Sequence, residues 1–393
     1  MTSVKHLKIL LIGNYLPDEQ QSMIRYANLV QATAKKAGHR VTLVVPPAIF
    51  GQLRGLPAAA RKWLGYVDKY LLAPAYLRWM ARDADLVHVT DHSNSMYLQL
   101  AGGRAALITC HDLLAVNAAA GRYPGVRVGQ TGRLLQRWIA KGLRRARYVL
   151  SVSEKTAEEM RGLNPEPGQN LYVVHNPLNR RLERASMSEV ERVLSRHGVA
   201  PGTRYLLHVG GNQWYKNRIG VLQIWSILRM HDPFRSMKML LAGKPWTESM
   251  CALHAANELG DSALQLVEVS DAELTALYSG AEAMLFPSLE EGFGWPILEA
   301  QTCGCPVITS GHAPMSEVGG EASLYIDAYH PAAAAETILA QWESRLVVRE
   351  KAESNLERFD ADRIARSYAD VYQQVYADWV QHRQAGDSDT AAC

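Results

Sequence analysis

The sequence lacks any uncharged apolar run of about eighteen residues, the length that a helix needs to cross a bilayer. Its first residues, MTSVKHLKILLIG, show no signal-peptide cleavage pattern, and their apolar part is typical of a first strand. We therefore expect a cytoplasmic protein, with attachment to the inner face of the plasma membrane at most peripheral.

Cysteine is also scarce. The five cysteines are odd in number and scattered, at Cys110, Cys251, Cys303, Cys305 and Cys393. This distribution argues against a disulfide framework and for a reducing compartment. The closest pair, Cys303 and Cys305, has no second pair and no histidine cluster nearby to complete a zinc site, so we interpret both as small turn residues.

Two cofactor signatures are missing or misplaced. The loop after the first expected strand, residues 14–22, contains no G-x-G-x-x-G pattern, so nicotinamide or flavin binding is not expected there. Two D-x-D patterns are present, at residues 83–85 and 360–362. The first precedes a strand and the second opens a terminal helix, so we predict that neither holds a metal ion and that no cofactor is required.

The charge is unevenly distributed along the 393 residues. Residues 1–150 contain 21 Lys and Arg against 7 Asp and Glu, a balance of +14, and the remainder contains 21 against 32, a balance of −11. A cationic first part suggests an anionic partner, which would be a membrane surface, a phosphorylated acceptor or nucleic acid. No nucleic-acid-binding motif accompanies the charge, so we expect no nucleic acid.

Strands and helices alternate through the chain, which predicts an α/β fold with parallel sheets. Hydrophobic content of 48% is enough for two cores. The first set of strands is expected at 6–13, 40–46, 85–90, 105–110, 148–152 and 171–175. The second set is expected at 205–209, 237–242, 264–269, 283–286, 306–309 and 324–326.

We place the junction between two Rossmann-like domains, 1–180 and 181–359, near Arg180, in a polar passage at 178–203. Periodicity predicts a last helix at 360–384, followed by a flexible tail at 385–393.

Two segments of the first domain combine basic with apolar residues. Residues 56–82 are helical, with aromatic and basic side chains mixed, and fit either a bilayer interface or a buried helical hairpin flanked by solvated lysines. Residues 129–147 form a cationic amphipathic helix, which a solvated surface explains equally well.

One loop stands out in the second domain. The strand at 283–286 stops at Pro287, and the following loop contains Gly292 and Gly294 before Pro296 opens a helix. An anion can dock on free amides at such a helix start. Glu291 and Glu299 bracket the turn and can face one ligand, although a loop cap and an exposed helix residue would explain an arbitrary pair of glutamates.

The segments EGFGWPILEA and CGCPVITS around these glutamates resemble the E-x7-E signature of the family 4 glycosyltransferases. That family is retaining, depends on nucleotide sugars and has the GT-B fold. The resemblance implies two Rossmann-like, doubly wound parallel-sheet domains facing a central cleft, with a C-terminal helix crossing back to the first domain. It also implies that the first domain binds the acceptor and the second the nucleotide-sugar donor.

The resemblance assigns roles in the donor domain. Glu291 would hold the sugar hydroxyls, Glu299 the ribose hydroxyls and Lys216 the diphosphate. The family's arginine just before that lysine is missing, and Arg218 stands off the pattern as a substitute. The remaining donor-binding residues are backbone contacts and loop residues: Gly210, Gly211, Asn212, Val269, Ser270, Gly292, Phe293, Gly294 and Leu298.

In the first domain, His111 and Asp112 end a strand, a position that faces ligands in such sheets. A histidine that only caps the strand is the alternative. The resemblance implies that His111 contacts the transferred sugar, and we expect Asp112, Asn14 and Gln21 at the acceptor or sugar.

The predicted function is therefore a retaining glycosyltransferase, which fits polysaccharide biosynthesis. It would move a hexose from a UDP- or GDP-sugar to a glycan, lipid-linked or small-molecule acceptor by front-face attack. The alternatives are a nucleotide-sugar epimerase or a phosphorylase of the same fold, and an inactive sugar-nucleotide-binding subunit.

Overall fold

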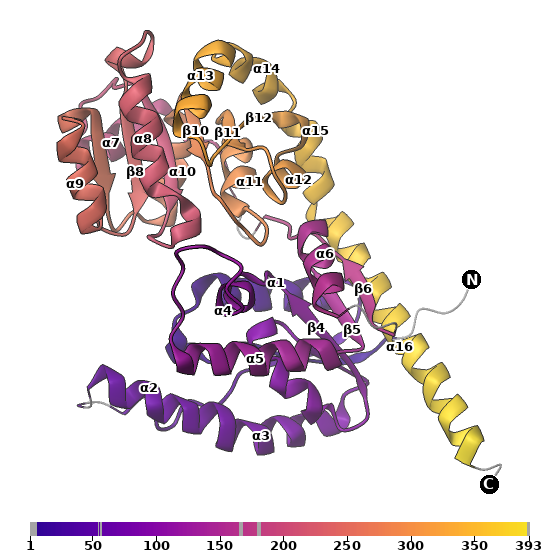
Figure 1. Ribbon diagram of the computed structural model, residues 1–393. Coiled ribbons are helices and arrows are strands. Elements are labelled where there is room, and N and C mark those ends of the chain that lie inside the picture. The colour runs from indigo at the N-terminus through magenta and orange to yellow at the C-terminus, as the bar shows by residue number, and fades with distance from the viewer. Residues whose placement is uncertain (1–5, 54, 56, 165–167, 179–181, 391–393) are drawn as a thin grey trace. The chain divides into compact units, whose positions relative to one another are not determined.

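The structure, a computed structural model, describes residues 6–390 apart from residues 54, 56, 165–167 and 179–181 (Figure 1). The chain divides into two compact units, Met1–Asn179 with Ala361–Cys393, and Arg180–Asp360. Within the described residues each unit is built on one six-stranded parallel sheet, which confirms the predicted α/β class. The predicted junction at Arg180 lies outside the described residues.

The sheet of the first unit has the strand order β2-β1-β3-β4-β5-β6. Its strands are β1 (Lys8–Ile12), β2 (Arg40–Val44), β3 (Leu86–Val89), β4 (Ala105–Cys110), β5 (Tyr148–Ser151) and β6 (Asn170–Val173). The central strands are buried almost throughout, because helices cover both faces of a parallel sheet. All six lie where the apolar runs predicted them.

The helices of the first unit are α1 (Gln21–Lys36), α2 (Ala58–Val67), α3 (Ala73–Met80), α4 (Leu114–Ala119), α5 (Gln130–Arg145) and α6 (Glu154–Leu163). A π-helix, η2 (Asp68–Leu72), joins α2 to α3 without a break, so the segment is one continuous run and the alternative of a hairpin is wrong (Figure 1). A 3-10 helix, η4 (His92–Ala101), follows β3 and was not predicted.

The sheet of the second unit has the order β12-β11-β10-β7-β8-β9. Its strands are β7 (Tyr205–Gly210), β8 (Lys238–Gly243), β9 (Ala263–Leu266), β10 (Ala283–Phe286), β11 (Val307–Ser310) and β12 (Ser323–Ile326). Residues of β7, β8 and β10 form the core together with Trp225 and Phe234, both fully buried.

The helices of the second unit are α7 (Met187–Arg196), α8 (Arg218–Leu228), α9 (Glu248–Ala256), α10 (Asp271–Gly280), α11 (Trp295–Thr302), α12 (Met315–Gly319), α13 (Pro331–Gln341), α14 (Ser344–Glu350) and α15 (Ala352–Leu356). Helix α7 is a correction, because we expected only a polar passage there. The Ser186 hydroxyl accepts from the Glu189 amide, while the Glu189 carboxylate accepts from the Ser186 amide, and this reciprocal cap starts the helix.

The last helix, α16 (Ala361–Thr390), belongs to the first unit, as expected of a C-terminal helix that crosses back. Its Tyr368 hydroxyl bonds with that of Tyr26 on α1 at 2.6 Å, and its Tyr372 hydroxyl bonds with His88 Nδ1 on β3 at 2.9 Å. The helix continues to Thr390, into the stretch from Ala385 that we expected to be a flexible tail, and residues 391–393 lie outside the described part. No helix in the described residues is both long and apolar enough to span a bilayer.

Candidate active site

The strand order of each sheet reverses at one point. In the first unit the chain builds outward in opposite directions from β1 and β3, and in the second unit from β7 and β10. Connections after two such neighbouring strands lead away from each other, which leaves a crevice at their carboxyl ends where open α/β sheets bind ligands. The predicted residues Asn14, Lys216 and Glu291 lie in the loops that follow β1, β7 and β10.

A lysine and a glutamate face each other at the switch point of the second unit. Lys216, at the end of the short helix η5 (Trp214–Lys216), donates from Nζ to Glu291 Oε1 at 2.6 Å. The Ser288 hydroxyl donates to the same oxygen at 2.9 Å. Glu291 is 7% exposed, so its charge is compensated within the protein. The structure thus brings together two residues that stand 75 positions apart.

Asn217, next to this lysine, connects the loop after β7 with the loops after β10 and β12. Its backbone is left-handed, with φ of 51°, and its side chain accepts from the Gly220 amide to cap α8. The same side chain donates to the carbonyls of Pro287 and Ala328, both at 3.0 Å. Asparagine suits this position because it adopts left-handed backbone more readily than other non-glycine residues. The Lys-Asn pair therefore combines a cation with the residue that fixes its position.

The loop that carries Glu291 is also held from the neighbouring strand β11. The Ser310 hydroxyl donates to the Ser288 carbonyl at 2.5 Å, and His312 Nε2 donates to the Leu289 carbonyl at 2.7 Å. The Leu289 amide donates to the Tyr215 carbonyl at 2.7 Å. A loop fixed on both sides presents its carboxylate without further ordering when a ligand binds.

Glu299 lies more than one turn inside α11 and is 6% exposed. Its Oε2 accepts from the hydroxyl of Tyr278, a fully buried residue of α10, at 3.1 Å. Glu299 is therefore not an ordinary exposed helix residue. A buried carboxylate with a fixed orientation is a strong acceptor for ligand hydroxyls.

The turn before α11 offers fewer amides than we expected. Gly294 has φ of 105° and forms the N-cap, and no side chain caps the helix. Pro296 has no N–H, and the Ile297 amide already donates to the Gly294 carbonyl at 3.0 Å. Gly292 and Phe293 lie in this turn, and Leu298 lies inside α11. The helix end therefore contributes mainly its dipole to an anion.

The glycines after β7 lie beside a buried arginine. Gly210 pairs with Gly243 of β8, and Gly211 leads to Asn212. The Arg218 guanidinium is 3% exposed and donates from Nη1 to Asn212 Oδ1 and to the Lys244 carbonyl, the latter at 2.7 Å. Its Nε and Nη2 have no hydrogen-bond partner among the described residues. Burial lowers the pKa of Arg218 to about 10.

Val269 and Ser270, two of the predicted donor-binding residues and the expected contacts of the nucleobase, lie beyond β9. Ser270 caps α10, and both its amide and its hydroxyl donate to the Glu273 carboxylate, at 2.9 and 2.6 Å. Contacts of a base with this turn would therefore have to use other groups of Val269 and Ser270.

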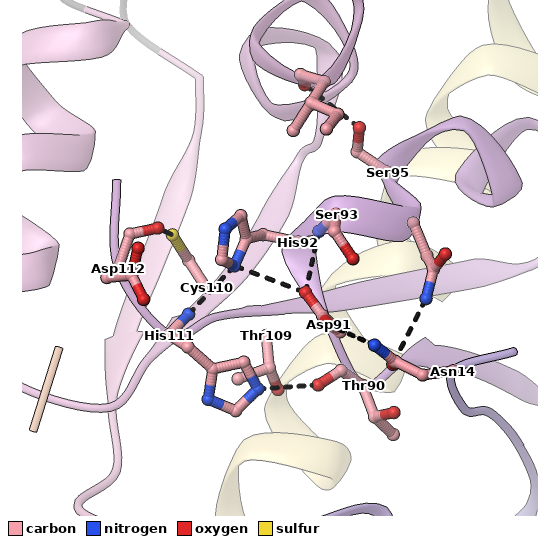
Figure 2. A network of polar contacts seen from close by, with 12 residues as sticks. Asn14, Thr90, Asp91, His92, Ser93, Ser95, Thr109, Cys110, His111 and Asp112 are labelled. Atoms are coloured by element: carbon pink, nitrogen blue, oxygen red, sulfur yellow. Dashed lines mark hydrogen bonds and ion pairs between the residues drawn. The ribbon is translucent and has the colours of Figure 1, made fainter. Parts of the chain in front are cut away.

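A second polar constellation lies at the carboxyl ends of β1, β3 and β4 in the first unit, and Figure 2 shows its members converging. Asn14 Nδ2 donates to Asp91 Oδ2 and to Gln20 Oε1, both at 2.5 Å. Asp91 is 3% exposed. Burial by itself raises the pKa of Asp91, but the imidazoles of His92 and His111 and the hydrogen bonds from Asn14 and the Ser93 amide outweigh it, so the pKa lies below its ordinary value.

His111 is buried within this constellation. Its Nε2 lies 2.9 Å from the Thr90 carbonyl, so Nε2 carries the proton and Nδ1 is an acceptor. The ring packs edge-on against Tyr26 at 4.4 Å. Burial lowers the pKa of His111 despite the nearby Asp91, which keeps the imidazole neutral at pH 7.

The other residues predicted at the acceptor or sugar have different surroundings in the structure. Asp112 Oδ1 accepts from the Leu114 amide at 2.9 Å and so starts α4. Asn14 lines a cavity of about 1040 Å³ together with Gln20, whereas Gln21 is exposed at the start of α1 and does not line it.

Sequence reasoning missed several partners: Asp91, Tyr278 and Ser288. Asp91-His92 directly follows a predicted strand, as His111-Asp112 does, and that placement was the available signal. Nothing in the sequence pairs Tyr278 with Glu299.

Two family models match consecutive parts of the chain. The model described as "Glycosyltransferase Family 4" matches residues 25–182, and the model described as "Glycosyl transferases group 1" matches residues 190–356.

Relatives with assigned names match parts of the chain. The O-antigen chain mannosyltransferase B of Escherichia coli is 29% identical over 259 residues, which is 65% of each chain. A D-inositol 3-phosphate glycosyltransferase of Pseudarthrobacter chlorophenolicus is 32% identical over 141 residues, 35% of this chain and 34% of the relative. The chain thus aligns with about two thirds or less of the length of these relatives.

Solved structures share the fold over nearly the whole chain. Sucrose-phosphate synthase from Thermosynechococcus elongatus has a TM-score of 0.69 and 18% identity, covering 95% of this chain and 100% of that one. Anabaena HepE in complex with UDP and glucose has a TM-score of 0.68 and 16% identity, covering 94% and 100%. These structures show the GT-B fold, and the two matched models show that the chain belongs to the family 4 glycosyltransferases.

Proposed function

We propose that this protein is a retaining glycosyltransferase that moves a hexose from a UDP- or GDP-sugar to a glycan, lipid-linked or small-molecule acceptor. The observation that carries the proposal is the ion pair of Lys216 with Glu291 at the switch point of the second sheet, together with the buried Glu299 on the helix that follows the same loop. A cation and two buried carboxylates suit a donor that combines a diphosphate with the hydroxyls of two sugars.

In this proposal the diphosphate competes with Glu291 for Lys216. When the donor binds, the Lys216 ammonium turns from the carboxylate at 2.6 Å to the phosphate oxygens. Glu291 is then free to accept from hydroxyls of the transferred sugar. Glu299, held by Tyr278, accepts from the ribose hydroxyls, and its fixed orientation reduces the entropy lost on binding.

The transfer itself needs no protein nucleophile. In front-face attack the departing phosphate oxygen takes the acceptor's proton, and the sugar passes through an oxocarbenium-like state with its configuration retained. Lys216 and the dipole of α11 stabilise the charge on the diphosphate as the bond to the sugar breaks. Within the first unit, the neutral His111 has an Nδ1 that would accept from a sugar hydroxyl, and Asn14 and Asp112 would serve the acceptor. The proposal requires no bound cofactor beyond the sugar nucleotide.

The first unit would provide the acceptor domain and a surface for an anionic bilayer. Large apolar side chains are exposed on α2, η2, α3 and α5: Trp63 at 68%, Leu71 at 71%, Trp79 at 60%, Leu134 at 70% and Trp138 at 42%. Arg61, Lys62 and Arg78 are exposed among them. Tryptophan beside lysine and arginine is typical of interfacial helices. Co-sedimentation with phosphatidylglycerol vesicles at low salt, lost at high salt, would support this surface, and its absence at low salt would contradict it.

The test of the donor site is nucleotide release from UDP- and GDP-sugars with a panel of acceptors. We expect Lys216→Ala and Glu299→Ala each to lower turnover by about a hundredfold, the loss typical of one transition-state donor or positioning group. Glu321→Ala, at a carboxylate 86% exposed, is the control and should leave turnover unchanged. Turnover that survives when both site residues are replaced would overturn these roles, and an epimerase would convert the donor without any acceptor.

A further inference from the structure

The part of the first unit between Asp112 and Glu154 has an extreme charge pattern. It contains eight lysines and arginines and no aspartate or glutamate. Helix α5 carries five of them, and Figure 1 shows this helix beside α4. Within the part of the chain that the structure describes, no carboxylate lies within 4 Å of the five cations of α5.

Four arginines of this stretch line one cavity of about 590 Å³ between α4 and α5. They are Arg122, Arg133, Arg137 and Arg144, and no carboxylate is among the described residues of its lining. The three consecutive alanines 118–120 form another part of the wall, so the space is not filled by large side chains. We call this cavity the arginine pocket.

The four arginines of the pocket are exposed, and their like charges repel one another weakly. Arg133 and Arg137 are four residues apart on one helix, where like charges repel. Arg122 is oriented, because its Nη1 donates to Asn117 Oδ1 at 3.1 Å. Asn117 is 5% exposed and donates in turn to Glu159 Oε1 at 3.2 Å. An anion between the guanidinium groups would replace repulsion by charge-assisted hydrogen bonds.

The arginine pocket lies close to the residues placed at the transferred sugar. Helix α4 starts two residues after Asp112 and lines the pocket, and its six residues rise only about 9 Å at 1.5 Å each. Gln136 of α5 lines both this pocket and the larger cavity that contains Asn14. The two cavities therefore share the part of their walls that Gln136 forms.

We propose that the arginine pocket binds a phosphate or diphosphate group of the acceptor. One guanidinium group can donate two parallel N–H bonds to phosphate oxygens. Four such groups suit a phosphate with two negative charges better than a neutral glycan. The acceptor is then a phosphorylated sugar or a sugar carried on a lipid phosphate. This inference rests on the proposed function, because it names the substrate class of the acceptor side.

Calorimetric titration with pyrophosphate tests the pocket in the full chain. The background carries Lys216→Ala, so that pyrophosphate bound at the donor site does not contribute. We expect one site in this background, weakened about tenfold to a hundredfold by Arg133→Gln with Arg137→Gln, which removes two charge-assisted contacts. The matched control, Lys141→Gln with Arg145→Gln, removes the same charge from the same helix outside the pocket and should weaken binding less than about threefold through screened, longer-range attraction alone.

Equal weakening in both double variants, or no pyrophosphate binding in the background, would overturn the proposal. Failure of the proposed donor site would be seen separately, as a lack of nucleotide binding by the chain with native Lys216, because that binding does not involve these arginines. Two further arms separate the sources of the phosphate. Loss of binding to phosphatidylglycerol vesicles in the pocket variant alone assigns the pocket to a lipid phosphate, whereas loss of glucose 1-phosphate binding with vesicle binding retained assigns it to a soluble phosphorylated sugar.

Discussion

At the scale of single residues, the ion pair between Lys216 and Glu291 occupies the cation that the proposed function assigns to the diphosphate. The pair is mostly shielded from water, with side-chain exposures of 17% and 9%, so each charge depends on the other in the empty site. A third charge brought by a ligand must break this contact. In the proposed function, Glu291 would therefore compete with the donor diphosphate for Lys216.

This competition makes Glu291→Gln a diagnostic change. We expect nucleotide to bind several-fold more tightly, because Lys216 no longer has an ionised partner, while transfer slows by about a hundredfold through loss of the sugar contact. Calorimetry with UDP and GDP and turnover measurements report the two effects separately. Nucleotide binding that weakens in step with turnover would contradict the competition.

A second residue-scale feature is His88, fully buried between Tyr372 and Thr109. Burial lowers its pKa to about 3 from an ordinary value of 6.5. As pH falls below 6.5 the unfolded chain takes up a proton that the folded protein does not, so stability decreases by about 1.4 kcal/mol per pH unit. The stabilisation is complete above pH 6.5 and is lost progressively towards pH 3.

We expect His88→Gln to reduce the acid sensitivity of the first unit. The amide can keep both hydrogen bonds without titrating, so between pH 6.5 and 5 the variant should lose about 2 kcal/mol less than the wild type. Urea unfolding at several pH values measures this difference. Above pH 7.5 the two proteins should respond alike, and parallel losses below pH 6.5 would refute the assignment.

At the scale of elements, β7 and β8 pack closely at their carboxyl ends, just before the loop that carries Lys216. Gly210 pairs with Gly243 at the ends of these strands. A Cβ at Gly243 would lie 2.0 Å from the Gly210 carbonyl oxygen, and the φ of this glycine is +153°. Backbone cannot yield as a flexible side chain can, so only glycine fits there.

Gly243→Ala should therefore destabilise the second unit by about 3 kcal/mol or more and displace the loop that carries Lys216. Gly260→Ala is the control. Its φ is +48°, but no atom lies within 4 Å of its added Cβ, so the cost should be about 1 kcal/mol. Thermal unfolding compares the two, and equal losses would show that the backbone approach is not limiting.

Several elements were predictable, whereas η4 and α7 were not recognised. The twelve strands found among the described residues follow apolar runs, since parallel strands covered on both faces need continuous hydrophobic sequence. Helix α7 was missed because its polar residues outnumber Val190, Val193 and Leu194, its buried apolar side. The Ser186-x-x-Glu189 pattern was a readable start signal.

The site was predictable only as far as local pattern reaches. Glu291, Glu299 and Lys216 were found by motif, but their contacts with Ser288 and Tyr278 depend on which strands and helices become neighbours. The positive φ of Asn217 likewise results from two distant carbonyls that its side chain must reach. Such tertiary partners leave no spacing in the sequence.

At the scale of the molecule, the chain returns to its first unit through α16. The hydroxyls of Tyr26 and Tyr368, and the buried Tyr372 and Val375, tie this helix to α1 and the sheet. Tyr148 donates to Asp378 Oδ2 at 2.5 Å and adds a contact nearer the end. The first unit is thus assembled from both ends of the chain.

Truncation after Asp360 should unfold or strongly destabilise the first unit and leave the second intact. Removing α16 exposes a fully buried apolar and aromatic surface, and each such side chain contributes about 1.5–3 kcal/mol on burial. Calorimetry should show one transition lost or shifted down and the other unchanged. A truncated chain that melts like the full one would contradict this dependence.

The proposed function depends most on Lys216 and Glu299 binding one and the same nucleotide donor. The most direct measurement is the stabilisation of the protein by UDP and GDP, since a ligand present at a hundred times its Kd adds about 2.7 kcal/mol to the folded state. We predict that at least one of the two nucleotides raises the melting temperature of the wild type and of Glu321→Ala. The same rise in the double variant Lys216→Ala with Glu299→Ala would contradict the claim.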